Sequence, residues 1–477
     1  MALSPLICRR GRLTFLRSAA WPRRWVRTQL VGQPTLAELL QTAERSSSWT
    51  ATKCLAVLGE VTSRAIQENQ VADLLQSPIF SSLLDRVQHR LYGFSASEAY
   101  LLLLCISRVK SALNASSVQA LEPLQKRALE QLAEDLEELS SERLVEVLHL
   151  GSRGLGQALP EFWRELSELL SQRLDTGSLS PRALLLAADA LASSAEEGIA
   201  RSRLVPQVVR QSRECLEHFS LKQLARLAGD LHQLDVSQEI LDELVQRLCG
   251  AAEALPPPAL ATAMTVAVRK EELELLQLRC LEIAHTCHAS DAILTLRALV
   301  CQSSFPVELM ILLLMQVVKQ PRSVWSDVEE RALHQVTLSI LHDPNAEDVR
   351  RALEDAEELW DACYRPEEVV LEAPDEEALK AVGHVPEALQ AAGIEVARVA
   401  EGQIIRDFYW LPMMIQLKDG QWLGIDADGR REDGHRDPFR RLKQRHLHLW
   451  DIPLLWHRRE AGSFRGLVEE ILPLTRT

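Results

Sequence analysis

The sequence of 477 residues lacks most of the patterns that define enzymes and membrane proteins. Its nine cysteines form no Cys-x-x-Cys pair, which argues against a zinc knuckle and fits a reducing compartment. The apolar run at residues 309–318 is shorter than the about 20 residues that a membrane-spanning helix needs, so we interpret it as a fully buried helix. No Ser/His/Asp or Cys/His arrangement and no kinase constellation stands out. We expect no membrane span, no cofactor and no bound metal.

Two short patterns look like ligand sites but predict structure instead. Residues 151–156, Gly-Ser-Arg-Gly-Leu-Gly, have the glycines of a phosphate loop, but they follow a helical pattern and lack its lysine and hydroxyl, so we interpret them as a helix-terminating loop. Four ligand-type residues crowd the segment 280–288, namely Cys280, His285, Cys287 and His288. Their spacing is not that of a zinc loop, and buried packing cysteines are the preferred interpretation.

The beginning of the chain has no acidic residue before Glu38. Residues 1–28 contain seven arginines: Arg9, Arg10, Arg12, Arg17, Arg23, Arg24 and Arg27. A basic, acid-free, amphipathic start is typical of a mitochondrial presequence, whereas a secretory signal would need a continuous apolar run. We expect a presequence over residues 1–30, cleavage between Trp25 and Pro34, and a location in the mitochondrial matrix. Loss of the seven arginines lowers the formal charge from −14 to −21, so any contact with RNA must be local.

Residues 34–362 are predicted to form an α-helical repeat domain. An apolar residue followed by serine recurs at Phe94-Ser95, Leu139-Ser140, Leu179-Ser180 and Phe219-Ser220, and a similar start recurs at Ser290. Each such pair predicts a helix start with a hydrophobic staple, and Gln223 completes a capping box for Ser220. Partner helices are expected at 160–174, 204–216 and 238–248, with another beginning near Ala259 after three prolines. Paired helices with this period indicate a degenerate α-solenoid.

Residues 366–477 are predicted to form a small α/β domain. We expect strands at 368–371 and 393–399, short helices at 375–382 and 386–392, and a closing helix at 467–472. Within it, Asp419-Gly420 supplies the positive φ of a hairpin turn between strands 411–417 and 421–425. A basic helix at 438–449 and an apolar strand at 452–456 follow. On that helix the pattern places Phe439, Leu442, Arg445 and His446 on one side, with Arg440, Arg441, Lys443 and Gln444 over the rest.

This order of elements resembles the RAP domain, an RNA-binding module abundant in apicomplexan parasites and found in the Fas-activated serine/threonine kinase-like family of mitochondrial RNA proteins. The resemblance covers about residues 405–465 and depends on Asp428, Gly429, His435, Arg441, Lys443, Arg445, Leu447, Pro453 and Trp456. The loop between Gly429 and His435 is longer and more charged than the family's usual one. The RAP fold is thought to resemble PD-(D/E)XK endonucleases, so the resemblance implies a restriction-endonuclease-like domain.

The stretch from Gly424 to Arg459 is net basic, with nine Lys/Arg against six Asp/Glu and four histidines. For RNA binding we single out the cations and aromatic rings of this stretch: Arg440, Arg441, Lys443, Arg445, His435, Arg458, Arg459, Trp422 and Trp450, with Trp456 as a further stacking surface or core residue. The other interpretation of these charges is a solvated helix face. Asp426 and Asp428 share one strand face and would be the metal ligands of a nuclease, but the lysine of that motif is missing from the strand.

The sequence therefore predicts a non-catalytic mitochondrial RNA-binding protein, with its RAP-like domain on organellar rRNA or mRNA and its helical repeats on other proteins. It would act in ribosome structure or assembly, in RNA processing, or in RNA stability or translation. One alternative is a protein scaffold in a mitochondrial complex, such as a mitoribosome or a respiratory assembly. A second is a divergent metal-dependent RNA endonuclease. Reversing the charges of the basic helix should separate RNA binding from scaffolding.

Overall fold

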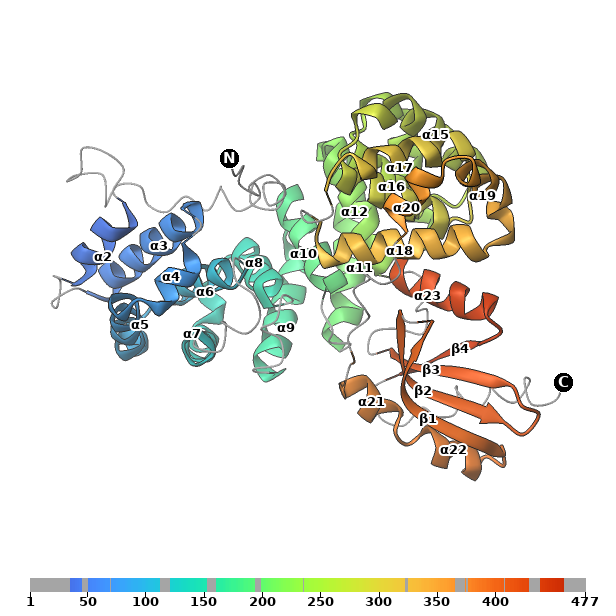
Figure 1. Ribbon diagram of the computed structural model, residues 1–477. Helices are drawn as coiled ribbons and strands as arrows, with labels where there is room; N and C mark the ends of the chain where they lie inside the picture. The colour runs from blue at the N-terminus through green and yellow to red at the C-terminus, as the bar shows by residue number, and fades with distance from the viewer. Residues whose placement is uncertain are drawn as a thin grey trace. The chain divides into compact units, whose positions relative to one another are not determined.

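The computed structural model describes residues 35–458, apart from residues 45–49, 69, 112–120, 152–159, 194–198, 235, 322–324, 365–373, 375, 407 and 429–437. The chain is mainly helical, with a small four-stranded sheet near its C-terminal end (Figure 1). It divides into two compact units, and the division falls within helix α11 (Ile199–Glu214), between Gln207 and Val208. Across the described part of the chain, no helix combines the length and apolarity needed to cross a membrane.

The first unit consists of helices that pack in sequence: α2 (Leu36–Glu44), α3 (Ala51–Gln67), α4 (Val71–Gln76), α5 (Pro78–Arg90), α6 (Ala96–Ser111), α7 (Glu122–Glu134), α8 (Ser141–Gly151), α9 (Pro160–Thr176) and α10 (Pro181–Ser193). Short 3-10 turns lie at η2 (Leu91–Gly93) and η5 (Leu136–Glu138). Every second helix stacks on the next one of its row, since α6 packs on α8, α8 on α10, and α7 on α9.

The second unit repeats this pairing in its helical part. Its helices are α12 (Leu221–Gln233), α13 (Gln238–Gly250), α14 (Pro257–Val266), α15 (Lys270–Ile283), α16 (Ala289–Cys301), α17 (Val307–Val318), α18 (Asp327–His342), α19 (Glu347–Glu354) and α20 (Glu357–Cys363). The 3-10 turns η7 (Leu216–His218), η8 (Ala252–Ala254), η9 (Ala284–Thr286) and η11 (Pro344–Ala346) separate some of them. Helices α12, α14, α16 and α18 form one packed row, and α13, α15 and α17 form a second.

The apolar-serine rhythm marks real helix starts. The hydroxyls of Ser95, Ser140 and Ser180 each accept a hydrogen bond from the backbone N–H three residues on, at 3.3–3.4 Å. Ser220 and Gln223 form the predicted capping box. Such caps satisfy N–H groups that have no partner within the helix. The expected start at Ser290 is wrong by two residues, because α16 begins at Ala289 with His288 as its N-cap residue.

The C-terminal sheet has the strand order β1-β2-β3-β4. Strands β1 (Val396–Ile405), β2 (Tyr409–Leu417) and β3 (Trp422–Asp428) form an antiparallel meander, and β4 (Leu454–Arg458) is parallel to β3. Helix α23 (Pro438–Leu449) makes the crossover between β3 and β4, as a parallel pair requires. The predicted hairpin is confirmed, and Gly420 has the positive φ of 93° that the turn needs.

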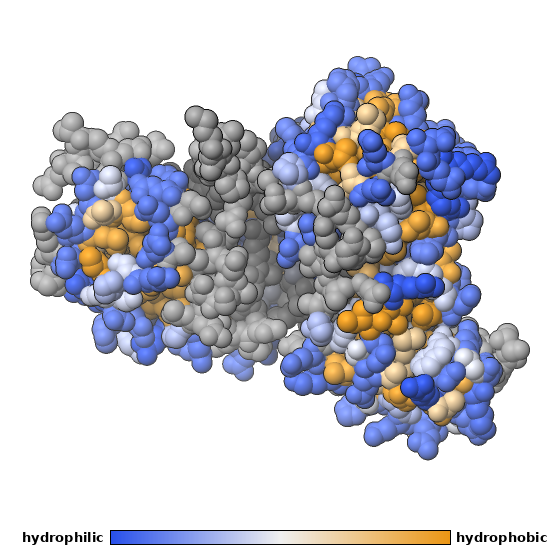
Figure 2. Space-filling view, viewed as in Figure 1, coloured by the Kyte–Doolittle hydropathy of each residue, from blue (hydrophilic) through white to orange (hydrophobic). Residues whose placement is uncertain are grey.

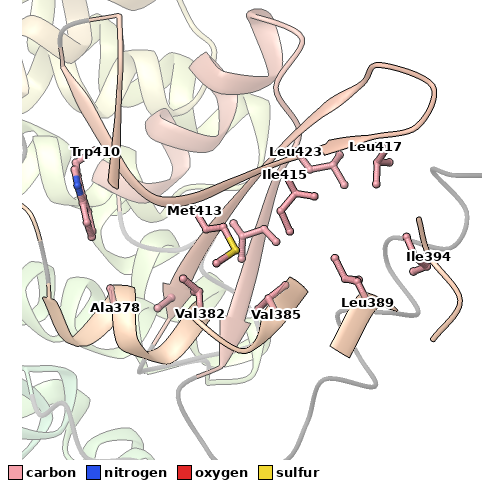
Figure 3. Packing of buried hydrophobic residues seen from close by; sticks show 12 residues of the cluster. Ala378, Val382, Val385, Leu389, Ile394, Trp410, Met413, Ile415, Leu417 and Leu423 are labelled. Carbon is pink, nitrogen blue, oxygen red and sulfur yellow. The ribbon is translucent and has the colours of Figure 1, made fainter. Parts of the chain in front are cut away.

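Two short helices, α21 (Glu376–Val382) and α22 (Val385–Ala391), cover one face of this sheet. Figure 3 shows their apolar side chains pointing toward those of the strands, and the main members of this core are Ala378, Val382, Val385, Leu389, Met413, Ile415 and Leu423. Leu447 of α23 packs with Leu411 and Leu454 in a separate cluster. Helix α23 also packs on α16 and α18, so it joins the sheet to the helices of the second unit.

Several predicted helix and strand boundaries agree with the structure and others differ from it. Helices α9 and α13 begin at the predicted residues 160 and 238, whereas α11 begins five residues earlier than expected and β1 runs to Ile405 instead of residue 399. The presequence, the strand at 368–371 and the closing helix at 467–472 fall outside the described residues. The interpretation of residues 309–318 as a fully buried helix is wrong, because Met315 and Val318 of α17 are 45% and 37% exposed.

The glycine that opens the loop-like segment 151–156 is needed for close packing. Gly151 ends α8, and a methyl group there would lie 2.0 Å from Cη2 of Trp163, which is buried on α9. We expect Gly151→Ala to destabilise the first unit by about 1–3 kcal/mol, because the indole ring has to move. Gly250→Ala is the matched control, since Gly250 also ends a helix but has open space around its Cα. Hydrogen exchange of α8 and α9 peptides would measure the loss. Equal protection in both variants would contradict this role for Gly151.

Candidate nucleic-acid interface

Helix α23, which we predicted to contact RNA phosphates, buries four side chains on two successive turns. Leu442, Lys443, His446 and Leu447 are all at most 1% exposed, and their spacing of one, three and one residues places them on one side of the helix. The predicted faces are therefore partly wrong: His446 is on the buried side as expected, whereas Lys443 is buried instead of solvated. A lysine and a histidine in an interior must find partners, because an unpaired buried charge is costly.

Lys443 finds its partners on two strands of the sheet. Its Nζ lies 2.7 Å from Oδ2 of Asp426 on β3 and donates to the backbone oxygen of Trp410 on β2, also at 2.7 Å. The second carboxylate oxygen of Asp426 accepts the N–H of Ala427 at 2.8 Å. The side chains of the ion pair are 1% and 11% exposed, so the pair is almost fully removed from water. Lys443 is thus part of the domain's interior and does not reach a phosphate from this position.

The ion pair with Lys443 also affects whether the carboxylate of Asp426 could bind the metal ion of an endonuclease. A divalent metal in such a site would be bound by strand carboxylate oxygens. Here one oxygen of Asp426 is bonded to an ammonium group and the other to a backbone N–H, so a positive charge already lies beside this carboxylate and disfavours a second cation there. The side chain of its expected partner, Asp428, lies outside the described residues. Among described residues, no group of three or more His, Cys, Asp or Glu side chains is placed to hold a metal ion.

His446 lies in a closed series of hydrogen bonds that begins and ends at Gln335 of α18. The side-chain N–H of Gln335 donates to the hydroxyl of Tyr409 at 3.1 Å, and the Tyr409 hydroxyl lies 2.7 Å from Nδ1 of His446. On the other side, Nε2 of His446 lies 2.8 Å from Oγ of Ser339, which donates to the backbone oxygen of Gln335 at 2.9 Å. Since the Ser339 proton is used by Gln335, Nε2 must carry the imidazole proton and Nδ1 must accept from Tyr409.

The series requires a neutral imidazole. Burial, with smaller contributions from the charges of Arg445, His342 and His334, lowers the pKa of His446 to about 3. A protonated Nδ1 would face the hydroxyl hydrogen of Tyr409, whose oxygen already accepts from Gln335. The histidine is therefore a structural connector between α18, β2 and α23. It is not a titrating surface group near neutral pH.

Two arginines of α23 contact the C-terminal ends of other helices. Arg445 donates to the backbone oxygen of Val300, in the last turn of α16, at 2.8 Å and forms an ion pair with Asp343, the C-cap residue of α18. Arg441 lies 3.3 Å from Nε2 of His232, in the last turn of α12. Carbonyl groups at a helix C-terminus carry partial negative charge, so these positions favour cations. The contacts give both arginines an intramolecular role that the sequence did not indicate.

Of the remaining predicted contacts, the structure describes the side chains of one arginine and three tryptophans. Arg440 is half-buried and its guanidinium lies 5.2 Å from the ring centroid of Trp456, a favourable cation–π distance. Trp422, Trp450 and Trp456 are partly buried against the cluster of Leu411 and Leu447. The structure thus brings Arg440 together with one tryptophan. Arg459, His435 and the side chain of Arg458 lie outside the described residues.

Four residues that contact α23 or its partners were not predicted from the sequence: Gln335 and Ser339 on α18, its C-cap residue Asp343, and Tyr409 on β2. A signal for the first two is the run His334-Gln-Val-Thr-Leu-Ser339, in which polar residues alternate with apolar ones along α18. Polar residues in the middle of a buried helix must have hydrogen-bond partners. Of the cysteine and histidine cluster, Cys280 and Cys287 are buried, and burial raises their pKa values to about 12 and about 11, in keeping with packing cysteines.

No protein-family model matches this chain, and no curated protein matches it significantly.

We expect Lys443→Met to destabilise the α/β domain by about 3–5 kcal/mol, because it leaves the carboxylate of Asp426 buried and without its cation. The double variant Lys443→Met with Asp426→Asn should recover a large part of this loss, since no buried charge remains. Hydrogen exchange of peptides from β3 and α23 would report the local free energy of opening. A double variant no more stable than the single one would show that the two residues do not act as a pair.

The neutral histidine predicts a specific loss of stability in acid. The folded-state pKa of His446, about 3, is below the ordinary value of about 6.5, so the unfolded chain binds one more proton between these values. Stability is therefore present above pH 6.5 and falls by about 1.4 kcal/mol per pH unit as the pH decreases toward 3, or about 2 kcal/mol at pH 5. Urea denaturation at pH 7 and pH 5 would measure it.

His446→Gln should be less stable than the natural chain at pH 7 but should lose less stability between pH 7 and pH 5. His448→Gln is the control, because His448 is exposed on the same helix. An unchanged pH dependence in the His446 variant would mean that another group carries the acid sensitivity.

Proposed function

We propose that the chain is a non-catalytic mitochondrial RNA-binding protein, an α-solenoid joined to a RAP-like α/β domain. The observation that carries the proposal is the fold of residues 409–458, a hairpin, a basic crossover helix and a parallel fourth strand. This is the order of elements on which the resemblance to the RAP domain depends. The stacked rows of paired helices support the repeat architecture of the proposal. The arginine-rich first 28 residues support delivery to the mitochondrial matrix.

We propose a non-catalytic role for the α/β domain because of the ion pair at Asp426. A RAP-like domain of the endonuclease kind would use strand carboxylates to hold a metal ion. In this chain an ammonium group, that of Lys443, stands against the strand carboxylate and is held there by a second bond to Trp410. The same pair holds α23 on the sheet, and its ammonium group disfavours the binding of a second cation at Asp426. We therefore propose that the domain binds RNA and does not cleave it.

We assign contact with RNA to the arginine of α23 that lies beside a tryptophan and to Arg458 and Arg459. The first is Arg440, whose guanidinium lies over the ring of Trp456, and a cation next to an aromatic ring suits contact with both a phosphate and a base. A few local cations suit single-stranded RNA on a chain whose formal charge is −14, because the acidic body would repel a longer nucleic-acid track.

The test is binding of a fluorescently labelled single-stranded RNA by the triple variant Arg440→Glu, Arg458→Glu and Arg459→Glu. If three phosphate contacts are lost, affinity should fall and the slope of log K against log salt concentration should decrease by about 2, at about 0.7 per phosphate. The control triple variant Lys270→Glu, Lys319→Glu and Arg351→Glu makes the same change of charge at exposed positions. Equal loss in both variants would mean that net charge, and no local site, governs binding.

A scaffold in a mitochondrial complex is the second candidate, and the internal contacts of Arg441, Lys443 and Arg445 favour it, since they explain much of the basic helix without RNA. Ultraviolet crosslinking of the tagged protein in mitochondria, beside a sucrose gradient, separates the two. Crosslinks to rRNA in a ribosomal peak would identify a mitoribosomal component, and crosslinks to mRNA or precursors in light fractions would identify a processing or stability factor. Absence of crosslinks in a protein that migrates in a large complex would leave the scaffold.

A further inference from the structure

Helix α17 exposes apolar side chains that its own unit does not cover. Ten of its twelve residues are apolar, which is more than one buried face can accommodate. Leu309, Met310, Leu313, Leu314 and Val317 are buried. The outward side carries Ile311, Leu312, Met315 and Val318, of which the first two are partly buried and the last two are 45% and 37% exposed. We call these four residues the α17 stripe.

The neighbouring helix α15 adds to this apolar surface. It packs against α17, and its Leu275 and Leu278 are 45% and 62% exposed. In Figure 2, orange side chains among blue ones face the viewer over the helices of the second unit, where Figure 1 places α15, α16 and α17. Single exposed leucines are ordinary, but apolar residues gathered on two adjoining helices are typical of an interaction surface.

The helices next to the α17 stripe are acidic. Besides α16, helix α17 contacts α15, α19 and α20. Residues 270–283 and 347–363, which include these three helices, carry eleven Asp and Glu residues against four Lys and Arg. Three of the four cations are already paired with local carboxylates: Lys270 with Glu274, Arg279 with Glu282, and Arg351 with Glu347. The fourth, Arg350, donates to the backbone oxygens of Ile340 and Asp343.

This combination of apolar centre and acidic margins selects the class of partner. RNA would be repelled by the carboxylates, so the surface is distinct from the proposed phosphate contacts of α23. A second copy of this chain would bring one acidic margin against another, which is unfavourable. A helix with an apolar face and basic flanks would satisfy both features. Ile311, Met315 and Val318 follow the helical spacing of four and three residues and run about 10 Å along the axis, which matches about two turns of a partner helix.

We propose that the α17 stripe, with Leu275 and Leu278, is a docking surface for a basic amphipathic helix of a partner protein. The inference is independent of RNA binding, because it uses other residues and the opposite charge. Binding would bury Met315 and Val318 at the centre of the contact, while lysine or arginine residues of the partner face the carboxylates of α15 and α19. Association should therefore weaken with salt and should be lost when either the apolar centre or the charge of the partner is changed.

The experiment measures binding of a fluorescently labelled synthetic helical peptide of leucine and lysine, with leucines spaced three and four residues apart, to the full chain by anisotropy. Met315→Asp should weaken binding by about tenfold, because a charge replaces an apolar group at the centre of the contact. Tyr92→Asp is the matched control, since Tyr92 is 83% exposed in the first unit. Because Met315 is exposed, its variant should keep the melting temperature of the natural chain. A peptide with every lysine replaced by glutamate should not bind.

Three results would overturn the proposal. Equal affinity of the natural chain and Met315→Asp would show that the peptide binds elsewhere. A dimer in light scattering that Met315→Asp abolishes would identify a second copy as the occupant. Peptide binding that appears only after removal of residues 1–34 would identify the chain's own arginine-rich beginning as the occupant. A salt-sensitive, Met315-dependent contact with the full chain is the result that supports a partner helix.

Discussion

The burial of Lys443 against Asp426 is the constraint on which the α/β domain depends. The ammonium group bonds β3 through Asp426 and β2 through the carbonyl of Trp410, so it fixes the crossover helix over the two central strands. An ion pair of this kind contributes little net stability over an apolar pair, because both charges lose their water. Its value lies in position: α23 cannot rotate or slide without leaving two charges buried and unpaired. The helix therefore has a defined face toward the sheet and, as a result, a defined face toward α16 and α18.

The face of α23 toward α16 and α18 is held by polar contacts in which the donor and the acceptor of each hydrogen bond are fixed. The series from Gln335 through Tyr409, His446 and Ser339 has a single allowed direction of proton donation, since Ser339 gives its proton to a backbone carbonyl. Arg445 adds contacts to the ends of α16 and α18. A buried network of mutually bonded polar groups specifies one arrangement and penalises others, because any shift breaks several of these bonds at once. The sheet and the last helices of the repeat are thus expected to unfold together.

The sequence predicted those features whose cause is local. Asp419-Gly420 determines a turn by its own φ preference, and Ser220 with Gln223 caps a helix from within four residues. The placement of Lys443 was not predictable in the same way. Helical geometry puts residue 443 beside 439 and 447, on the inward side, yet its charge argued for solvent. The deciding fact is an aspartate 17 residues away on a strand, and only the tertiary structure brings the two together. The same holds for Arg441 and Arg445, because the sequence pattern shows their charge but not the helix ends that they contact.

In the second unit, the cations of α23 and the carboxylates around the α17 stripe therefore make different kinds of contact. Cations of α23 are directed inward, to a carboxylate and to helix C-termini, while the carboxylates of α15, α19 and α20 lie around an apolar stripe that the unit leaves open. Helix α16 contacts both α23 and α17, but the proposed RNA contacts and the α17 stripe use different residues, so a ligand on one surface need not displace a ligand on the other. If RNA binds near Arg440 and a basic helix binds near Met315, the two can be held at once, and the acidic margins would keep the RNA from competing for the protein surface. Because α16 packs on both α17 and α23, any coupling between the two surfaces would pass through this helix and should be small in binding free energy unless one ligand distorts its packing.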